Sequence, residues 1–235
     1  MFRELLALFR SGEPLSELSE DFSEMLRLSL DLVKRGGQAY FRHSITPEEH
    51  EELNRQDTKV NRLQRRIRKH IVISLSVDMQ FSSRVNAMEL PYCLLLMSLV
   101  KDVERIGDYS KDLVDLVALS DELPAGEHFS RLAALRDSIE AKFEAACEVF
   151  EASDQERAIS LIRGGRELAS DCERIIQAVA RASYPAGAAV KLALGARFYQ
   201  RIIEHVLNLL SSVVMPLHKL DYYDERDIEK ALQAD

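Results

Sequence analysis

A pattern of residues recurs once in this chain, at an interval of 96 residues. Residues 103–116 read VERIGDYSKDLVDL and residues 199–212 read YQRIIEHVLNLLSS, so that Arg105 aligns with Arg201. A pattern that recurs at such an interval indicates that one structural unit is used twice. The repeat therefore predicts a fold of two similar halves in tandem.

Helical signals fill both halves, and strand signals are almost absent. Apolar residues return at a spacing near 3.6 in several long segments, which is typical of amphipathic helices. They predict six helices, over residues 15–41, 47–75, 91–119, 130–152, 153–181 and 187–215. The interval 76–90 lacks this period and predicts a connection, longer than its counterpart in the second half. We therefore predict an all-α fold, in which two tandem three-helix repeats form a six-helix bundle.

Two of these helices have strong start signals. Thr46-Pro47-Glu48-Glu49 combines a capping threonine, proline at the first helical position and acids in the first turn. Ser153-Asp154-Gln155-Glu156 resembles a capping box. The breaks between helices divide the chain into a first repeat over 1–122, a second over 127–220 and a charged tail over 221–235.

Composition excludes several classes of protein. The net charge of −8 argues against a general nucleic-acid binder. No apolar run approaches the ~20 residues of a membrane span, and the start of the chain lacks the cleavage site of a signal peptide. The three cysteines are scattered and odd in number, which argues against structural zinc or a disulfide framework. These observations favour a cytoplasmic protein.

Four carboxylates fall on one side of the helix predicted over 91–119. Its residues Glu104, Asp108, Asp112 and Asp115 lie within an arc of about 80°, opposite the apolar side. Like charges four residues apart cost ~0.2–0.5 kcal/mol per pair, so a cation or a basic partner would stabilise this helix. Oxygen ligands leave Mg, Ca, Mn and Fe open as the metal. The alternative is a solvated acidic face that points away from the bundle.

Basic residues also gather, and each set has two readings. Residues 55–70 hold seven Lys or Arg and one Asp, which favours a solvated face. If this face is specific, it would dock an acidic partner through Arg62, Arg65, Arg66 and Lys69. Arg105 and Arg201 could bind phosphate, but we favour an interpretation in which they pair with acids on adjacent helices. His205 could be a nitrogen ligand or a half-exposed surface residue.

The string Glu104-Arg105-Ile106-Gly107-Asp108, within matched helix triplets, resembles the PhoU family of bacterial phosphate-uptake regulators. That family has two three-helix repeats, each with an acidic motif in its third helix, and the resemblance covers roughly residues 15–215. It implies that the acidic surface binds a metal ion, and the candidates are iron, zinc, nickel, manganese and magnesium. The implied ligands are Glu104, Asp108, Asp112, Asp57, Asn61, Glu204, Glu167 and Asp171. Gln200 departs from the motif in the second repeat and weakens a second site.

The resemblance also implies a function. A protein of this family is a non-enzymatic adaptor between the cytoplasmic component of a phosphate transporter and a histidine sensor kinase, and it reaches the membrane only through partners. Whether this chain forms a homodimer stays open. One alternative is a metal-dependent, ferritin-like enzyme, but its inward Glu-x-x-His pairs are missing from the sequence. Another is a metal-free interaction module that serves a sodium–phosphate or low-affinity phosphate carrier.

Overall fold

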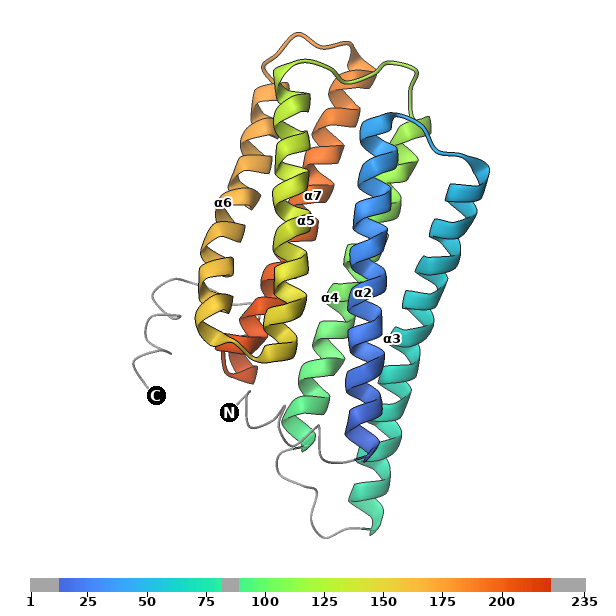
Figure 1. The fold of residues 1–235 in the computed structure, drawn as a ribbon, viewed down its shortest axis with the longest axis vertical. Coiled ribbons are helices and arrows are strands. Elements are labelled where there is room, and N and C mark those ends of the chain that lie inside the picture. Colours follow the sequence, from blue (N-terminus) through green and yellow to red (C-terminus); the bar gives the residue numbers. More distant parts are fainter. Residues whose placement is uncertain (1–12, 82–88, 221–235) are drawn as a thin grey trace.

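The computed structural model describes residues 13–81 and 89–220 of the 235-residue chain. These residues form long helices and no strand (Figure 1). The helices are α2 (Glu13–Arg42), α3 (Pro47–Phe81), α4 (Glu89–Ala118), α5 (Glu127–Ala152), α6 (Gln155–Val179) and α7 (Ala186–Val214), followed by the short 3-10 helix η1 (Leu217–Lys219). The predicted six-helix, all-α fold is thereby confirmed. The predicted tail over 221–235 lies outside the described residues.

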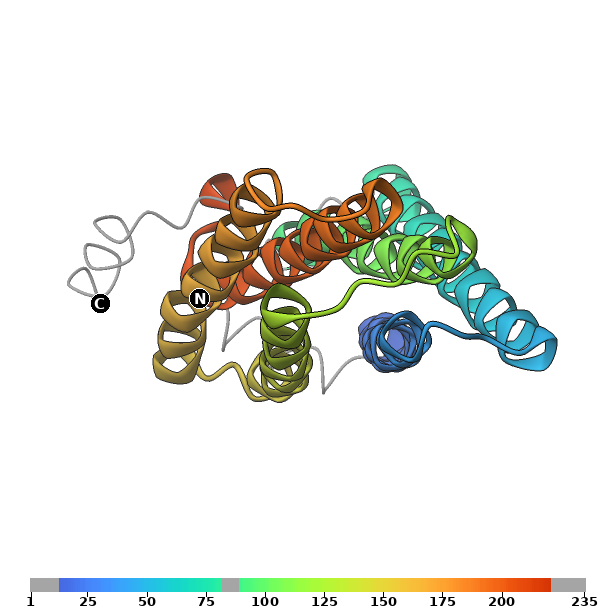
Figure 2. The same ribbon diagram turned by 90° about the horizontal axis from the view of Figure 1, so that it is seen from above.

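The six helices form two triplets that share a central seam. Helices α2 to α4 make the first repeat, and α5 to α7 make the second. The third helices α4 and α7 pack against each other, and α2 packs against α5. Seen from above, α3 and α6 lie at opposite outer sides of the bundle (Figure 2). Within the described residues, no helix is long and apolar enough to cross a membrane.

The start of α3 has the predicted capping threonine, here as part of a capping box, whereas the cap of α6 is one residue later than the predicted Ser153. The backbone N–H of Glu49 donates to the Thr46 hydroxyl at 3.2 Å, and the Glu49 carboxylate accepts from the Thr46 N–H at 2.9 Å. At α6 the cap is Asp154, whose side chain accepts from the Arg157 N–H. Ser153 is instead the left-handed residue that ends α5, with φ of 55°. Two residues, Ser153 and Asp154, thus separate these two helices.

The connection predicted over 76–90 is wrong at both ends. Helix α3 continues through Phe81, and α4 begins at Glu89, so that Pro91 lies in its first turn. Much of the extra length of the first repeat therefore extends a helix. The sequence of residues 76–81 lacks the 3.6-residue period of a helix buried on one face, so it carried no helical signal.

A buried lysine joins the second repeat to the end of α4. Lys191 of α7 is 1% exposed, and its ammonium donates to the carbonyls of Val117, at 3.2 Å, and Ser120. Its own carbonyl accepts from the Tyr40 hydroxyl at 3.0 Å. The C-terminal end of a helix attracts cations because its last carbonyls lack helical partners. Lys191 thus fixes α7 against the end of α4.

Candidate functional site

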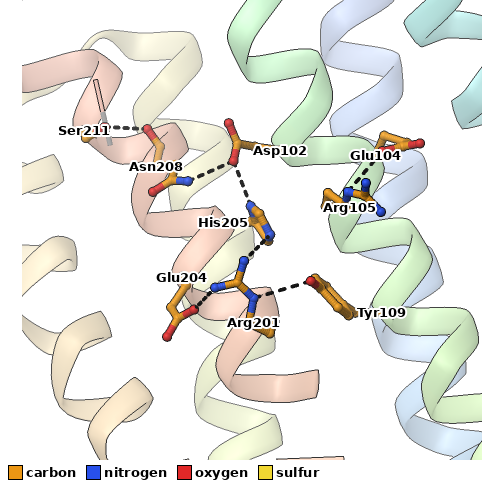
Figure 3. Close-up of polar contacts among 9 residues, drawn as sticks. All are labelled: Asp102, Glu104, Arg105, Tyr109, Arg201, Glu204, His205, Asn208 and Ser211. Carbon is orange, nitrogen blue, oxygen red and sulfur yellow. Dashed lines mark hydrogen bonds and ion pairs between the residues drawn. The ribbon is translucent and has the colours of Figure 1, made fainter. Parts of the chain in front are cut away.

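One carboxylate of α4 points into the seam between the two repeats (Figure 3). The Oδ1 atom of Asp102 lies 2.7 Å from Nδ1 of His205 and accepts from the Asn208 side-chain amide at 2.8 Å, both on α7. The Asp102 and His205 side chains are only 11% and 12% exposed. An ionised carboxylate can only accept, so this contact places a proton on Nδ1 of the imidazole. His205 is thus held inside the seam rather than half exposed on the surface.

Arg201 links the same histidine to α4. Its guanidinium donates to Glu204 on its own helix and, at 3.4 Å, to the hydroxyl of Tyr109 on α4. A third contact, also 3.4 Å, joins its Nη2 to Nε2 of His205. The hydrogen bond with Tyr109, and then the charge of Glu204, hold the pKa of Arg201 above its usual value. Arg201 is therefore charged and fixed in direction.

Arg105, which occupies the equivalent position in the first repeat, pairs within its own helix. Its Nη1 donates to Asp108 at 3.1 Å, and its Nε lies 3.9 Å from Glu104. The prediction that the two motif arginines pair with acids on adjacent helices is therefore wrong. Both acids contacted through Nη1, Asp108 and Glu204, lie three residues further along the same helix as their arginine. This spacing brings side chains together on one helix face.

An open cleft of about 320 Å³ lies between α4 and α7. It is lined by Met97, Ser98, Lys101, Asp102, Arg105, Tyr109, Arg201 and His205. Three of these side chains carry positive charge, and one, Asp102, is a carboxylate. The two arginines of the repeated motif thus face a single shared cleft.

The acidic face of the first repeat is partly buried instead of fully solvated. Burial, and then the charge of Asp108, raises the pKa of Glu104. Burial also raises the pKa of Asp108, against the opposing charge of Arg105. For Asp112 the causes are burial and then the charges of Asp115 and Asp108. These acids therefore repel one another in a setting that favours either a proton or a cation.

Asp57 and Asn61 of α3 lie beside this face. The amide of Asn61 donates to Asp57 at 3.2 Å, and the charge of Asp57 contributes to the raised pKa of Asp108. Asp57 is 6% exposed, and the ammonium of Lys111 on α4 donates to it at 3.0 Å. A lysine thus supplies the positive charge at the buried end of this acidic group.

In the second repeat, the predicted acids have cationic neighbours. Asp171 accepts from Arg131 and from Arg174, each at 2.7 Å, and although burial opposes it, these hydrogen bonds lower the pKa of Asp171. Burial lowers the pKa of Lys142, and the charge of Glu167 opposes this shift. Glu204 is bound by Arg201, as described above. The second repeat therefore offers little free carboxylate.

The fit to a metal ion differs between the repeats. Across residues 13–81 and 89–220, no three His, Cys, Asp or Glu side chains lie together in a group that could hold an ion. The first repeat has the oxygen donors that a hard cation prefers, in Asp57, Glu104 and Asp108. A bound ion there would have to displace Lys111 and draw these three carboxylates together, since they do not form such a group in the structure. The second repeat does not fit, because arginines occupy the carboxylates of Asp171 and Glu204.

The predicted basic face on α3 is partly used within the fold. Arg66 donates twice to Asp21 of α2, and Arg65 donates to the Asn61 carbonyl at 3.0 Å. Arg62 and Lys69 are exposed, and neither forms an ion pair with a described residue. Two of the four predicted residues are therefore free for a partner.

Asp102 is the residue of the seam that sequence reasoning missed. It follows Leu99 by three residues and directly precedes Val103, both buried, so it lies at the edge of the apolar face of its helix. A carboxylate in that position needs a buried partner. Its aligned residue in the second repeat is Phe198, which offers no acid. This exception to the repeat was the available signal.

The fold and seam define a helical protein of two tandem three-helix repeats. Residues 15–117 match the family model of the PhoU domain, which confirms the resemblance. The first repeat therefore carries the match to this family.

Two solved structures share the fold over nearly their whole length. PhoU from Pseudomonas aeruginosa has a TM-score of 0.75 and 16% identity, over 88% of this chain and 98% of that one. The phosphate transport system regulatory protein PhoU from Streptococcus pneumoniae has a TM-score of 0.73 and 16% identity, over 89% and 97%. At this identity the likeness establishes the fold. No curated protein sequence matches the chain significantly.

Proposed function

We propose that this chain is a non-enzymatic regulator of phosphate uptake and phosphate-starvation signalling. The observation that carries the proposal is the PhoU domain over residues 15–117, in a chain whose whole fold follows that of PhoU proteins. One of those proteins is described as a phosphate transport system regulatory protein. A helical adaptor acts by presenting surfaces, so its function depends on the exposed faces of the bundle.

The partners in this proposal are the cytoplasmic component of a phosphate transporter and a histidine sensor kinase. Helix α3 lies at the outside of the bundle (Figure 2) and carries the exposed cations Arg62 and Lys69. Charge complementarity at the edge of an interface speeds association and selects the partner. We assign this face of α3 to an acidic surface on one of the two partners.

The proposal includes a metal ion on the first repeat, held by Asp57, Glu104 and Asp108. A cation would relieve the repulsion that contributes to the raised pKa values of Glu104 and Asp108. The oxygen donors suit magnesium or manganese, and iron, zinc and nickel are the further candidates. Calorimetric titration of the purified chain with each ion tests this part. If none of these ions gives a heat of binding, the metal site is refuted, but the proposed regulatory role is not.

The regulatory role is tested in the organism that encodes the chain. Deleting the gene should switch on phosphate-starvation genes in phosphate-rich medium, and the wild-type gene should restore repression. Capture of the tagged chain from the same cells should recover a phosphate-transporter component or a sensor kinase. Unchanged expression after deletion would overturn the proposal.

A metal-free interaction module for a sodium–phosphate or low-affinity phosphate carrier is the second candidate. The observation that favours it is the pairing of acids with basic side chains, with Lys111 on Asp57 and two arginines on Asp171. The double variant Glu104→Gln/Asp108→Asn separates the two candidates. If it still represses the starvation genes, regulation does not need the metal.

A further inference from the structure

Two arginines that occupy the same place in the repeated motif face one cleft at the seam. Arg105 comes from α4 and Arg201 from α7, and both line the cleft of about 320 Å³ together with Lys101. We propose that this cleft is an oxyanion site that binds a phosphate group. This inference concerns binding alone and does not depend on the proposed regulatory role.

The charges that line the cleft are unbalanced. Its one carboxylate, Asp102, is already engaged by His205 and Asn208 of α7. Lys101 is exposed and forms no ion pair with any described side chain. The lining itself holds three cations and one carboxylate, and Glu104, Asp108 and Glu204 outside it pair with the two arginines. Lys101 therefore supplies the positive charge that would draw an anion to the cleft, since it is paired with no described acid.

The arginines are held in place before any ligand arrives. Acids on their own helices, Asp108 and Glu204, bind one edge of each guanidinium. A guanidinium has five N–H donors in a planar fork, so donors remain on each arginine. This fork matches the oxygens of a phosphate group, and a fixed side chain loses less entropy when it binds. Lys101 adds a mobile point charge at the rim.

The neighbours of Arg201 shape the inner wall. Its guanidinium lies 5.9 Å from the ring centroid of Tyr109, and that ring stacks with His205 at 5.8 Å between centroids. An anion that contacts both arginines would therefore touch the third helix of each repeat. Binding would tie α4 to α7 across the seam.

The shared chemistry is a phosphate group, and two sources can supply it. One is free inorganic phosphate, and the other is a small phosphorylated compound such as a nucleotide. Each titration should therefore be run with inorganic phosphate and with ADP, at constant ionic strength in chloride buffer. Saturable binding of phosphate alone identifies the free anion as ligand, whereas tighter binding of ADP identifies a phosphorylated compound.

The test compares two pairs of exposed basic residues. Lys101→Gln/Arg105→Gln removes two charges from the cleft, and Arg62→Gln/Arg65→Gln removes two charges from α3. The cleft variant should bind the phosphate probe at least tenfold more weakly than wild type, whereas the α3 variant should stay within twofold. The charge-preserving variant Lys101→Arg should retain binding. Melting temperatures of all variants establish that each one is folded.

Two results would overturn the site. One is the lack of saturable binding of either probe to the wild-type chain at millimolar concentration. The other is an equal loss of affinity in the cleft and α3 variants, because the effect would then follow net charge rather than position.

Discussion

Phe198 in α7 occupies the position that Asp102 occupies in α4, 96 residues earlier in the repeat. Each faces the other third helix: Asp102 binds His205 at 2.7 Å, and Phe198 stacks on Tyr109 with centroids 6.0 Å apart. Tyr109 and His205 are themselves separated by the same interval. The seam therefore makes the same contact twice, once with polar side chains and once with aromatic ones.

The polar contact predicts a loss of stability in Asp102→Ala. The His205 Nδ1–H and the Asn208 amide would lose their acceptor inside the seam, and leaving a buried donor unpaired costs about 1–3 kcal/mol. Urea denaturation should show this decrease in the free energy of unfolding. The neighbouring exposed residue Lys101 is the control. Lys101→Ala should change the free energy of unfolding by less than about 0.5 kcal/mol. Equal effects would show that Asp102 is not engaged across the seam.

Glu140 on α5 predicts a pH-dependent stability. Burial, against the opposing charge of Arg136, raises its pKa to about 7. Its buried Oε1 atom has no hydrogen-bond partner among the described residues. Because this pKa is above the ordinary value of 4.5, the group favours the fold fully below about pH 4.5. That contribution is lost as pH rises through 7.

Glu140→Gln should therefore raise the free energy of unfolding at pH 8 by about 1–2 kcal/mol, once solvent screening is allowed for. At pH 4.5 the wild-type acid is itself neutral in the folded chain, so the variant should then differ little. Melting temperatures across pH 4.5–8 provide the measurement. A gain of the same size at both pH values would contradict the raised pKa.

The two repeats should differ in metal binding. Glu104→Gln/Asp108→Asn should reduce bound metal more than Gln200→Ala/Glu204→Gln, since carboxylate number sets the affinity of an oxygen site and Arg201 already holds Glu204. Equilibrium dialysis followed by elemental analysis gives the ratio. The Glu104 and Asp108 changes remove repulsion between half-buried acids, so the melting temperature should not fall. Equal losses of metal in the two variants would refute the asymmetry.

Lys191→Met should destabilise the protein. The change keeps the apolar stem but leaves the carbonyls of Val117 and Ser120 without the ammonium. We expect a loss of about 1.5–3 kcal/mol, typical of hydrogen bonds to charged groups. Lys34→Met, in an exposed ion pair with Glu144, is the matched control and should cost less than about 1 kcal/mol. If urea denaturation shows a similar loss of stability for both variants, Lys191 does not link α7 to α4.

The order of helices was predictable because each helix buries one face. A helix buried on one face has apolar residues at a spacing near 3.6 in its sequence. Residues 76–81 of α3 were missed because their sequence lacks that period. The partners of Asp102 were not predictable, since no local pattern says that α4 lies against α7. The shared cleft of Arg105 and Arg201 depends on the same packing and was hidden for the same reason.

Lys191 also bears on how a duplicated chain can change. Its aligned residue in the first repeat is Leu95, an apolar core residue, so the lysine belongs to one copy alone. Its ammonium instead binds carbonyls at the end of α4, in the other repeat. The two repeats therefore have different roles in the fold, and neither can replace the other. A chain made from two first halves would keep the helices but leave the last turn of each α4 without its cation.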